Sequence, residues 1–144
     1  MKSIRLNIKS RLENVSLVGL AVNKICSAMP FGEDDVYQTE LCVVEACNNV
    51  IEHAYSNKPD QDIDILIQQH ADRIVFDISD RGTPRPALYE SNLGFDPNDR
   101  SQLPDGGMGL FFIHEIMNEV EYRNQDGRNV LTLTKYCPGK REEP

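Results

Sequence analysis

The chain has 144 residues, of which 40% are hydrophobic and 26% are charged, and it carries a formal net charge of −8 at pH 7. This length and composition are typical of one globular domain with a single core, and no apolar run is long enough to span a membrane. The net negative charge argues against a general affinity for nucleic acid, because there is no excess of Lys and Arg to displace counterions from phosphates.

The first half of the chain has clear periodicity. It predicts a strand over residues 4–8, helices over 10–29 and 33–54, and strands over 63–67 and 74–78. The strands alternate apolar and polar residues, whereas the helices repeat apolar residues every three or four positions. Ser10 and Glu13 have the spacing of a capping box at the start of the first helix.

The second half begins with a long stretch without periodicity. Residues 80–109 contain four of the eight prolines and five of the nine glycines. A connection of this length inside a compact domain is usually a functional lid or disordered, so we predict a lid over about 82–106. A helix over 108–118 and strands over 120–124 and 129–136 follow.

This order of elements favours an α+β fold. Strands in pairs with helices between them predict a two-layer sandwich, in which helices cover one face of a mixed sheet. We expect one domain over residues 1–137 and a flexible tail over 138–144, where Pro, Gly and charged residues replace the periodicity. Because the N-terminus has no apolar signal-peptide stretch, we expect the protein to be cytoplasmic.

Four cysteines occur in the chain, and none belongs to a CxxC pair: Cys26, Cys42, Cys47 and Cys137. Buried, inert thiols are therefore favoured over a metal or redox role.

Three polar side chains share one face of the second predicted helix. Glu45, Asn49 and His53 are spaced by four residues, so they stack beside the apolar stripe. The carboxylate and the amide could place a base and a Mg²⁺ ion at adjacent points. The alternative is an ordinary solvated helix edge, and a structural role is favoured for His53.

Two glycine-containing segments are further candidates. Asp80 ends a predicted strand and Gly82 follows two residues later, so the carboxylate could accept a hydrogen bond from a flat ligand that the glycine lets approach. Residues 105–110 form a glycine run that opens a helix, where backbone N–H groups could bind phosphate. An ordinary turn and a flexible hinge are the alternatives. Neither a Rossmann fingerprint nor a Walker A loop is present.

Together, and in this order, the three segments resemble the motifs of the GHKL ATPase and kinase superfamily. The N box reads Glu45-Ala-Cys-Asn-Asn49, the G1 box Asp80-Arg-Gly82 and the G2 box Gly107-Met-Gly109. Within that superfamily the chain is most similar to the anti-sigma-factor serine-protein kinases, because of residues 44–55, 106–110 and 133–135. The resemblance covers nearly the whole chain.

The resemblance implies the Bergerat, or histidine-kinase-like ATPase, fold, with ATP and Mg²⁺ as ligands. It implies that Glu45 is the base for the incoming hydroxyl, that Asn49 holds Mg²⁺, and that Asp80 takes the adenine amino group. Gly82 would line the base pocket. The lid hinge and the phosphate-facing N–H groups would come from Gly107, Met108, Gly109 and Leu110. The Gly-Thr that often precedes the last strand is replaced by Arg128-Asn129, and we assign no role to Asn129.

The function implied is that of an ATP-dependent serine-protein kinase and anti-sigma factor. Its partners would be a sigma factor and a STAS-type anti-anti-sigma protein whose serine it phosphorylates, and a homodimer is favoured. Two alternatives remain: a nucleotide-dependent binding module without transfer chemistry, and the ATPase half of a histidine kinase. The second would need a phosphoacceptor helix pair, and only 32 residues precede the N-box helix.

Overall fold

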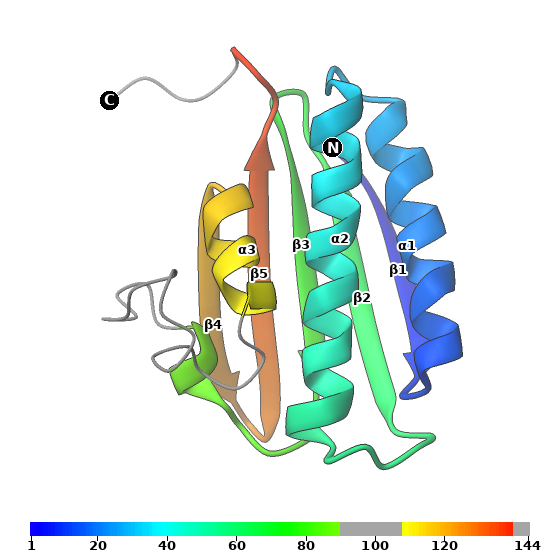
Figure 1. Cartoon of the computed structure of the whole chain (residues 1–144), viewed down its shortest axis with the longest axis vertical. Coiled ribbons are helices and arrows are strands. Elements are labelled where there is room, and N and C mark those ends of the chain that lie inside the picture. Colours follow the sequence, from blue (N-terminus) through cyan, green and yellow to red (C-terminus); the bar gives the residue numbers. More distant parts are fainter. Residues whose placement is uncertain (90–107, 140–144) are drawn as a thin grey trace.

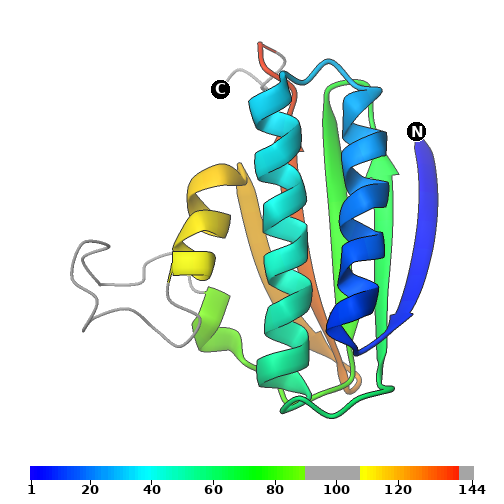
Figure 2. The same cartoon turned by 45° about the vertical axis from the view of Figure 1, so that its right-hand side comes forward.

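One layer of the protein is a β-sheet and the other is a set of helices that cover one of its faces (Figure 1). The structure is a computed structural model that describes residues 1–89 and 108–139. Figure 2 shows the two layers from a second direction, with the first two helices side by side over the sheet. Among the described helices, none combines the length and the apolar character needed to cross a membrane.

The described elements follow the predicted order. The strands are β1 (Lys2–Lys9), β2 (Asp62–Gln69), β3 (Arg73–Asp80), β4 (Glu119–Gln125) and β5 (Arg128–Tyr136). The helices are α1 (Leu12–Ser27), α2 (Glu33–Asn49) and α3 (Met108–Ile116). Two short helical turns accompany them: a π-helical turn, η1 (Val50–Ala54), and a 3₁₀ turn, η2 (Pro86–Tyr89). The α+β prediction, with helices on one face, is confirmed.

The sheet has the order β1-β2-β3-β5-β4, and each of these neighbouring pairs is antiparallel. The prediction of a mixed sheet is therefore wrong for the described strands. Two helices of opposite direction lie between β1 and β2, so β2 returns antiparallel to β1. Strand β4 does run parallel to β3, but β5 lies between them and is antiparallel to both.

The core lies between the helices and the inner face of the sheet. Alternate residues of the central strands point inward and are almost fully buried, as period-two patterning requires: Ile63, Ile65, Ile67, Ile74, Phe76, Ile78, Leu131 and Leu133. From the helices, Val18 and Val22 of α1, Val43 of α2 and Ile113 of α3 pack against them. Burial of such side chains contributes about 1.5–3 kcal/mol each, so this layer supplies most of the stability.

Ser10 does not cap α1, so the predicted capping box is wrong. The N-cap residue is Arg11, which makes no side-chain capping bond. The Ser10 hydroxyl instead donates to the carbonyl of Lys58 at 2.7 Å and accepts the N–H of Gln61 at 2.9 Å. These two bonds tie the start of α1 to the loop before β2.

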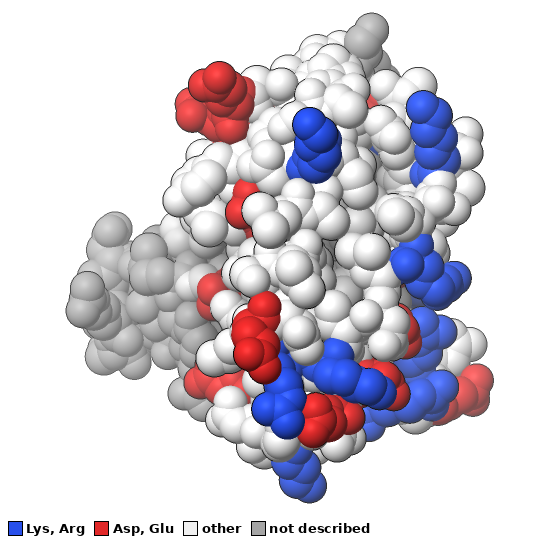
Figure 3. Space-filling model, turned by 90° about the vertical axis from the view of Figure 1, so that its right-hand side faces the viewer, with Lys and Arg blue, Asp and Glu red and all other residues white. Residues whose placement is uncertain are grey.

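Two ion pairs strengthen the same connection at the surface. Lys9 pairs with Asp62 at 2.7 Å, and Arg11 pairs with Asp60 at 2.8 Å. Figure 3 shows side chains of both signs gathered at the lower end of this edge of the molecule. Because all four side chains are about half exposed, solvent screens both pairs and they add little to stability.

Helix α2 ends in the wider π-helical turn η1. The N–H of Tyr55 bonds the carbonyl of Val50 at 2.9 Å, which is an i→i+5 bond. Beyond it, the Tyr55 hydroxyl donates to the carbonyl of Asp62 at 2.6 Å and accepts the N–H of Arg81 at 2.9 Å. The tyrosine thus holds together the end of the helix, the start of β2 and the end of β3.

Candidate nucleotide site

A small pocket lies where α2 ends, β3 ends and β5 begins, at the lower end of the sheet in Figure 1. Its volume is about 20 Å³, which holds roughly one water molecule. Its walls are Asn49, Val50, His53, Ala54, Ile78, Asp80, Arg85, Tyr89, Tyr122 and Leu131. A mostly apolar pocket with a few convergent polar groups is the usual form of a small-molecule site.

Asp80 is the acidic group of this pocket. It is only 6% exposed, and its Oδ1 accepts the N–H of Gly82 and an N–H of the Asn129 amide, both at 2.8 Å. Burial raises the pKa of Asp80, and the two hydrogen bonds oppose that rise. The carboxylate is thus held in place by one oxygen.

Gly82 follows Asp80 and packs directly on the end of the helix. A Cβ at position 82 would lie 2.6 Å from the carbonyl carbon of Ala54 and 2.9 Å from its Cβ. The N–H of Thr83 bonds the Ala54 carbonyl at 2.9 Å, which fixes this approach. Only glycine lets the chain run so close to η1.

Asn49 is the amide of the pocket. It is 3% exposed, and its Nδ2 has no hydrogen-bond partner among the described residues. A buried amino group without a partner costs free energy, which fits a donor to an oxygen of a bound ligand, whereas Mg²⁺ would need the oxygen of the same amide. The described residues contain no cluster of three or more His, Cys, Asp or Glu that could hold a metal alone. One amide oxygen does fit Mg²⁺ that arrives with a nucleotide, since this ion keeps several waters and binds substrate phosphates.

Two tyrosines also line this pocket. The rings of Tyr89 and Tyr122 stack with centroids 5.1 Å apart and an interplanar angle of 28°. Burial raises the pKa of the Tyr89 hydroxyl, and the neighbouring Asn49 side chain partly opposes that rise. The Tyr122 hydroxyl accepts the N–H of Arg85 at 3.0 Å. Because the cavity is too small for a purine base, part of its wall must move before a base can enter.

Glu45 lies one helical turn before Asn49 but does not line the pocket. Its carboxyl group packs against Gly109 of α3, where a Cβ would lie 2.6 Å from the Glu45 Cγ. Burial and, to a lesser degree, the carboxylate of Glu52 raise the pKa of Glu45. A carboxylate whose pKa is raised toward neutrality suits a general base.

The structure brings only some of the predicted site residues together. Asn49 and Asp80 line one pocket, whereas Gly82 is not among its walls and packs against Ala54. Gly109 contacts Glu45, whereas the Leu110 side chain is fully buried in the core. Gly107 and positions 90–106 of the predicted lid lie outside the described residues, and Met108 is described only as the first residue of α3.

Asn129 was assigned no role from the sequence, yet its side chain belongs to this site. It pairs directly with Asp80 between β5 and β3, and it is 2% exposed. The register of the two strands is the signal that identifies it, because residues opposite each other in an antiparallel pair lie side by side. Tyr89 and Tyr122 were also missed, since neither belongs to a motif.

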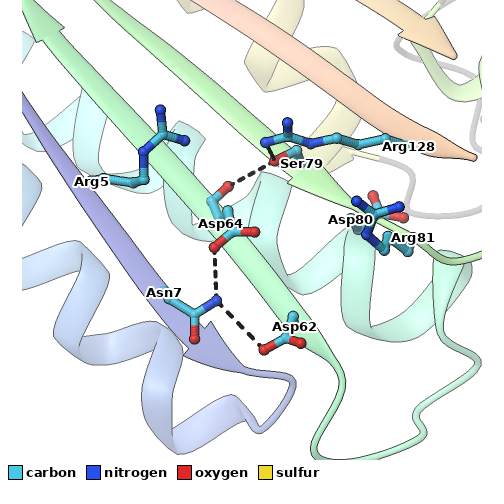
Figure 4. Close-up of a pocket in the computed structure, with 8 residues that line it drawn as sticks. All are labelled: Arg5, Asn7, Asp62, Asp64, Ser79, Asp80, Arg81 and Arg128. Carbon is cyan, nitrogen blue, oxygen red and sulfur yellow. Dashed lines mark hydrogen bonds between the residues drawn. The ribbon is translucent and has the colours of Figure 1, made fainter. Parts of the chain in front are cut away.

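A larger hollow of about 380 Å³ lies on the opposite, helix-free face of the sheet (Figure 4). It is lined by charged and polar side chains, among them Arg5, Asp64 and Arg128, and it lacks the apolar walls that a base needs. There Arg128 donates to the Ser79 hydroxyl at 2.8 Å. We therefore assign the candidate site to the helix side, although Asp80 borders both hollows.

Two proteins named serine-protein kinases are similar to the chain over almost its full length. The serine-protein kinase RsbW of Bacillus mycoides (strain KBAB4) is 28% identical over 145 residues, which cover 99% of this chain and 89% of the relative. The protein of the same name from Bacillus velezensis is 29% identical over 141 residues, with 96% and 88% covered.

Two solved structures share the fold. The RsbU and RsbW domains of a Mycobacterium tuberculosis protein align with a TM-score of 0.66 at 13% identity, over all of this chain and 35% of that longer one. The SiaB–SiaC complex of Pseudomonas aeruginosa aligns with a TM-score of 0.63 at 15% identity, with 92% and 89% covered.

The family comparison covers the elements that build the pocket. Residues 8–135 match the histidine kinase-like ATPase domain, a span that runs from the end of β1 to the end of β5. It includes Glu45, Asn49, Asp80 and Asn129. The chain belongs to the histidine kinase-like ATPase domain family.

Proposed function

We propose that this protein binds ATP with Mg²⁺ and transfers the γ-phosphoryl group to a serine of an anti-anti-sigma protein of the STAS type, and that it binds a sigma factor. One observation carries the proposal: two buried polar side chains from different elements, Asn49 and Asp80, line the same pocket. Family membership and the relatives named serine-protein kinases support it.

In this proposal each side chain has one task. The Asp80 carboxylate would accept a hydrogen bond from the amino group of adenine, and the oxygen of the Asn49 amide would hold Mg²⁺. Glu45 accepts the proton of the incoming serine hydroxyl. Phosphoryl transfer depends mainly on positioning and on charge neutralisation, so a bound metal supplies what an acidic chain with a net charge of −8 lacks.

The test separates binding from transfer. Calorimetry should give Mg²⁺-dependent ATP binding for the wild type, weaker Mg²⁺-ATP binding for Asn49→Ala, and weaker binding with or without metal for Asp80→Ala. Glu45→Gln should bind ATP normally but transfer labelled phosphate to a STAS-type protein about 10²–10⁴-fold more slowly. A wild type that does not bind ATP would refute the proposal.

A nucleotide-dependent binding module without transfer chemistry is the second candidate. It is favoured by the position of Glu45, whose carboxyl group lies against Gly109 and not in the wall of the pocket. ATP binding by the wild type, combined with no transfer to a partner protein that it captures, would select this function.

A further inference from the structure

The side chain of Asn129 is held by a network that fixes which way its amide points. Asn124, directly opposite on β4, donates its Nδ2 to the Asn129 Oδ1 at 2.6 Å. The Nδ2 of Asn129 in turn donates to the Asp80 Oδ1 at 2.8 Å and to the carbonyl of Gly82 at 3.0 Å. Every polar atom of the buried amide is therefore in use.

This network has only one satisfactory direction. An amide presents a donor group on one side and an acceptor on the other. If Asn129 were turned over, its oxygen would face the Asp80 carboxylate and the Gly82 carbonyl, which both accept hydrogen bonds. The Asn124 amino group would then meet another amino group. The hydrogen bonds therefore all run in one direction, from Asn124 on β4 through Asn129 on β5 to Asp80 on β3.

The network leaves one carboxylate oxygen of Asp80 for a ligand. Both described hydrogen bonds to the Asp80 side chain end on Oδ1. Its other oxygen can then accept a hydrogen bond from a ligand, while the bonds to Oδ1 keep the carboxylate from rotating. An ionised carboxylate only accepts, so it favours a base edge with an amino group over one with a carbonyl oxygen.

We propose that Asn129 is a positioning residue that orients Asp80. Through Asp80 it makes the site prefer a base that carries an amino group where adenine does. This inference rests on the proposed nucleotide binding. A threonine at this position has a single hydroxyl donor and could not serve Asp80 and Gly82 together. A residue with a single donor therefore cannot replace Asn129 in its network with Asn124, Asp80 and Gly82.

Base selectivity is the quantity that tests this assignment. Calorimetry with ATP and with inosine triphosphate, which has a carbonyl oxygen in place of the amino group, gives the ratio of the two affinities. The wild type should prefer ATP by about 10- to 100-fold, the range expected for a hydrogen bond to a charged group. Asn129→Ala should bind ATP about ten-fold more weakly and bind inosine triphosphate nearly as before, so the ratio falls.

Two further variants test the same hydrogen-bond network. Asn124→Ala changes an exposed residue and leaves the Asn129 amide without its anchor, so it should lower the same ratio by a smaller factor. Asn129→Thr should recover part of the ATP affinity lost in Asn129→Ala, because one donor to Asp80 is restored.

The outcomes separate the two proposals. Equal losses of affinity for both nucleotides in Asn129→Ala, or an unchanged ratio in Asn129→Ala and Asn124→Ala, would refute the role of Asn129 while leaving ATP binding established. A wild type that binds neither nucleotide would refute the proposed function itself.

Discussion

Gly109 of α3 lies directly against the carboxyl group of Glu45 on α2. A Cβ at position 109 would be 2.6 Å from the Glu45 Cγ, closer than real side chains approach one another. The contact links the start of α3 to the residue that we propose as the base. A substitution at position 109 can therefore displace the Glu45 carboxylate while residue 45 stays a glutamate.

Gly109→Ala should therefore slow phosphoryl transfer at least about ten-fold while leaving the fold intact. The Glu45 side chain can move away, and replacing a helical glycine by alanine contributes about 0.5–1 kcal/mol to stability. Gly19→Ala is the matched control, since its Cβ would meet Val44 and Glu40, neither of which lines the pocket. Single-turnover transfer and thermal unfolding measure the two effects, and equal transfer rates for both variants would contradict the assignment.

Gly82→Ala should act on both stability and binding. Its Cβ would collide with the backbone of Ala54, which cannot rotate away as a side chain can. We expect a loss of about 1–3 kcal/mol in the free energy of unfolding, as for other overpacked sites, together with weaker ATP binding. Urea denaturation and calorimetry test this, and a variant as stable as the wild type would show that η1 is free to shift.

The rate of transfer at saturating Mg²⁺-ATP should fall as the pH is lowered, because only ionised Glu45 can accept a proton. Burial and Glu52 raise the pKa of Glu45, so the fall should occur at higher pH than for an ordinary glutamate. Glu52→Gln removes a like charge from an exposed position and should move the midpoint to lower pH. Identical pH profiles for the two proteins would argue against Glu45 as the titrating group.

Tyr89 should leave its position when ATP binds, because the cavity beside it is too small for a purine. With fluorotyrosine incorporated at the five tyrosines, the ¹⁹F resonance that disappears in Tyr89→Phe should shift on ATP addition. Exposing a buried aromatic side chain costs about 1.5–3 kcal/mol, so Tyr89→Ala should bind ATP roughly ten-fold or more tightly. An unchanged resonance at saturating ATP would mean that the base binds elsewhere.

The four thiols should be unreactive in the folded protein. All four are buried, and burial raises the pKa of Cys26, Cys42 and Cys47 to about 12. Because the thiolate is the reactive form, a disulfide reagent at neutral pH should label none of them until denaturant is added. Rapid labelling of one cysteine in the native state would reveal an opening of the core around it.

The sequence was sufficient where a local pattern determines the structure. Period-two alternation over 63–67 and 74–78 identified the central strands, and the helices were found from their apolar spacing. Asn49 and Asp80 belong to two of the motifs, and the structure has both in the wall of one pocket because they lie at the ends of adjoining elements. The roles predicted for them stay predictions.

What the sequence could not provide depends on contacts between distant residues. Asn129 and Asp80 are 49 residues apart, so their hydrogen bond follows only from the register of β3 and β5. Ser10 has the spacing of a capping residue, but a loop that comes 48 residues later competes for its hydroxyl. The π-helical turn after Asn49 has no local signal either, since it depends on the fit of Ala54 against Gly82.

The π-helical turn η1 also determines where the chain can change length. Deleting one residue from Val50–Ala54 would convert the turn to an ordinary α-helical one and rotate everything beyond it by about 100°. The Ala54 carbonyl would then turn away from Thr83, and the wall of the pocket would be lost. The loop over 56–61 lies just beyond and is exposed, so it should accept insertions. Related sequences should accordingly keep their spacing from Asn49 to Ala54 and vary in length only after Tyr55.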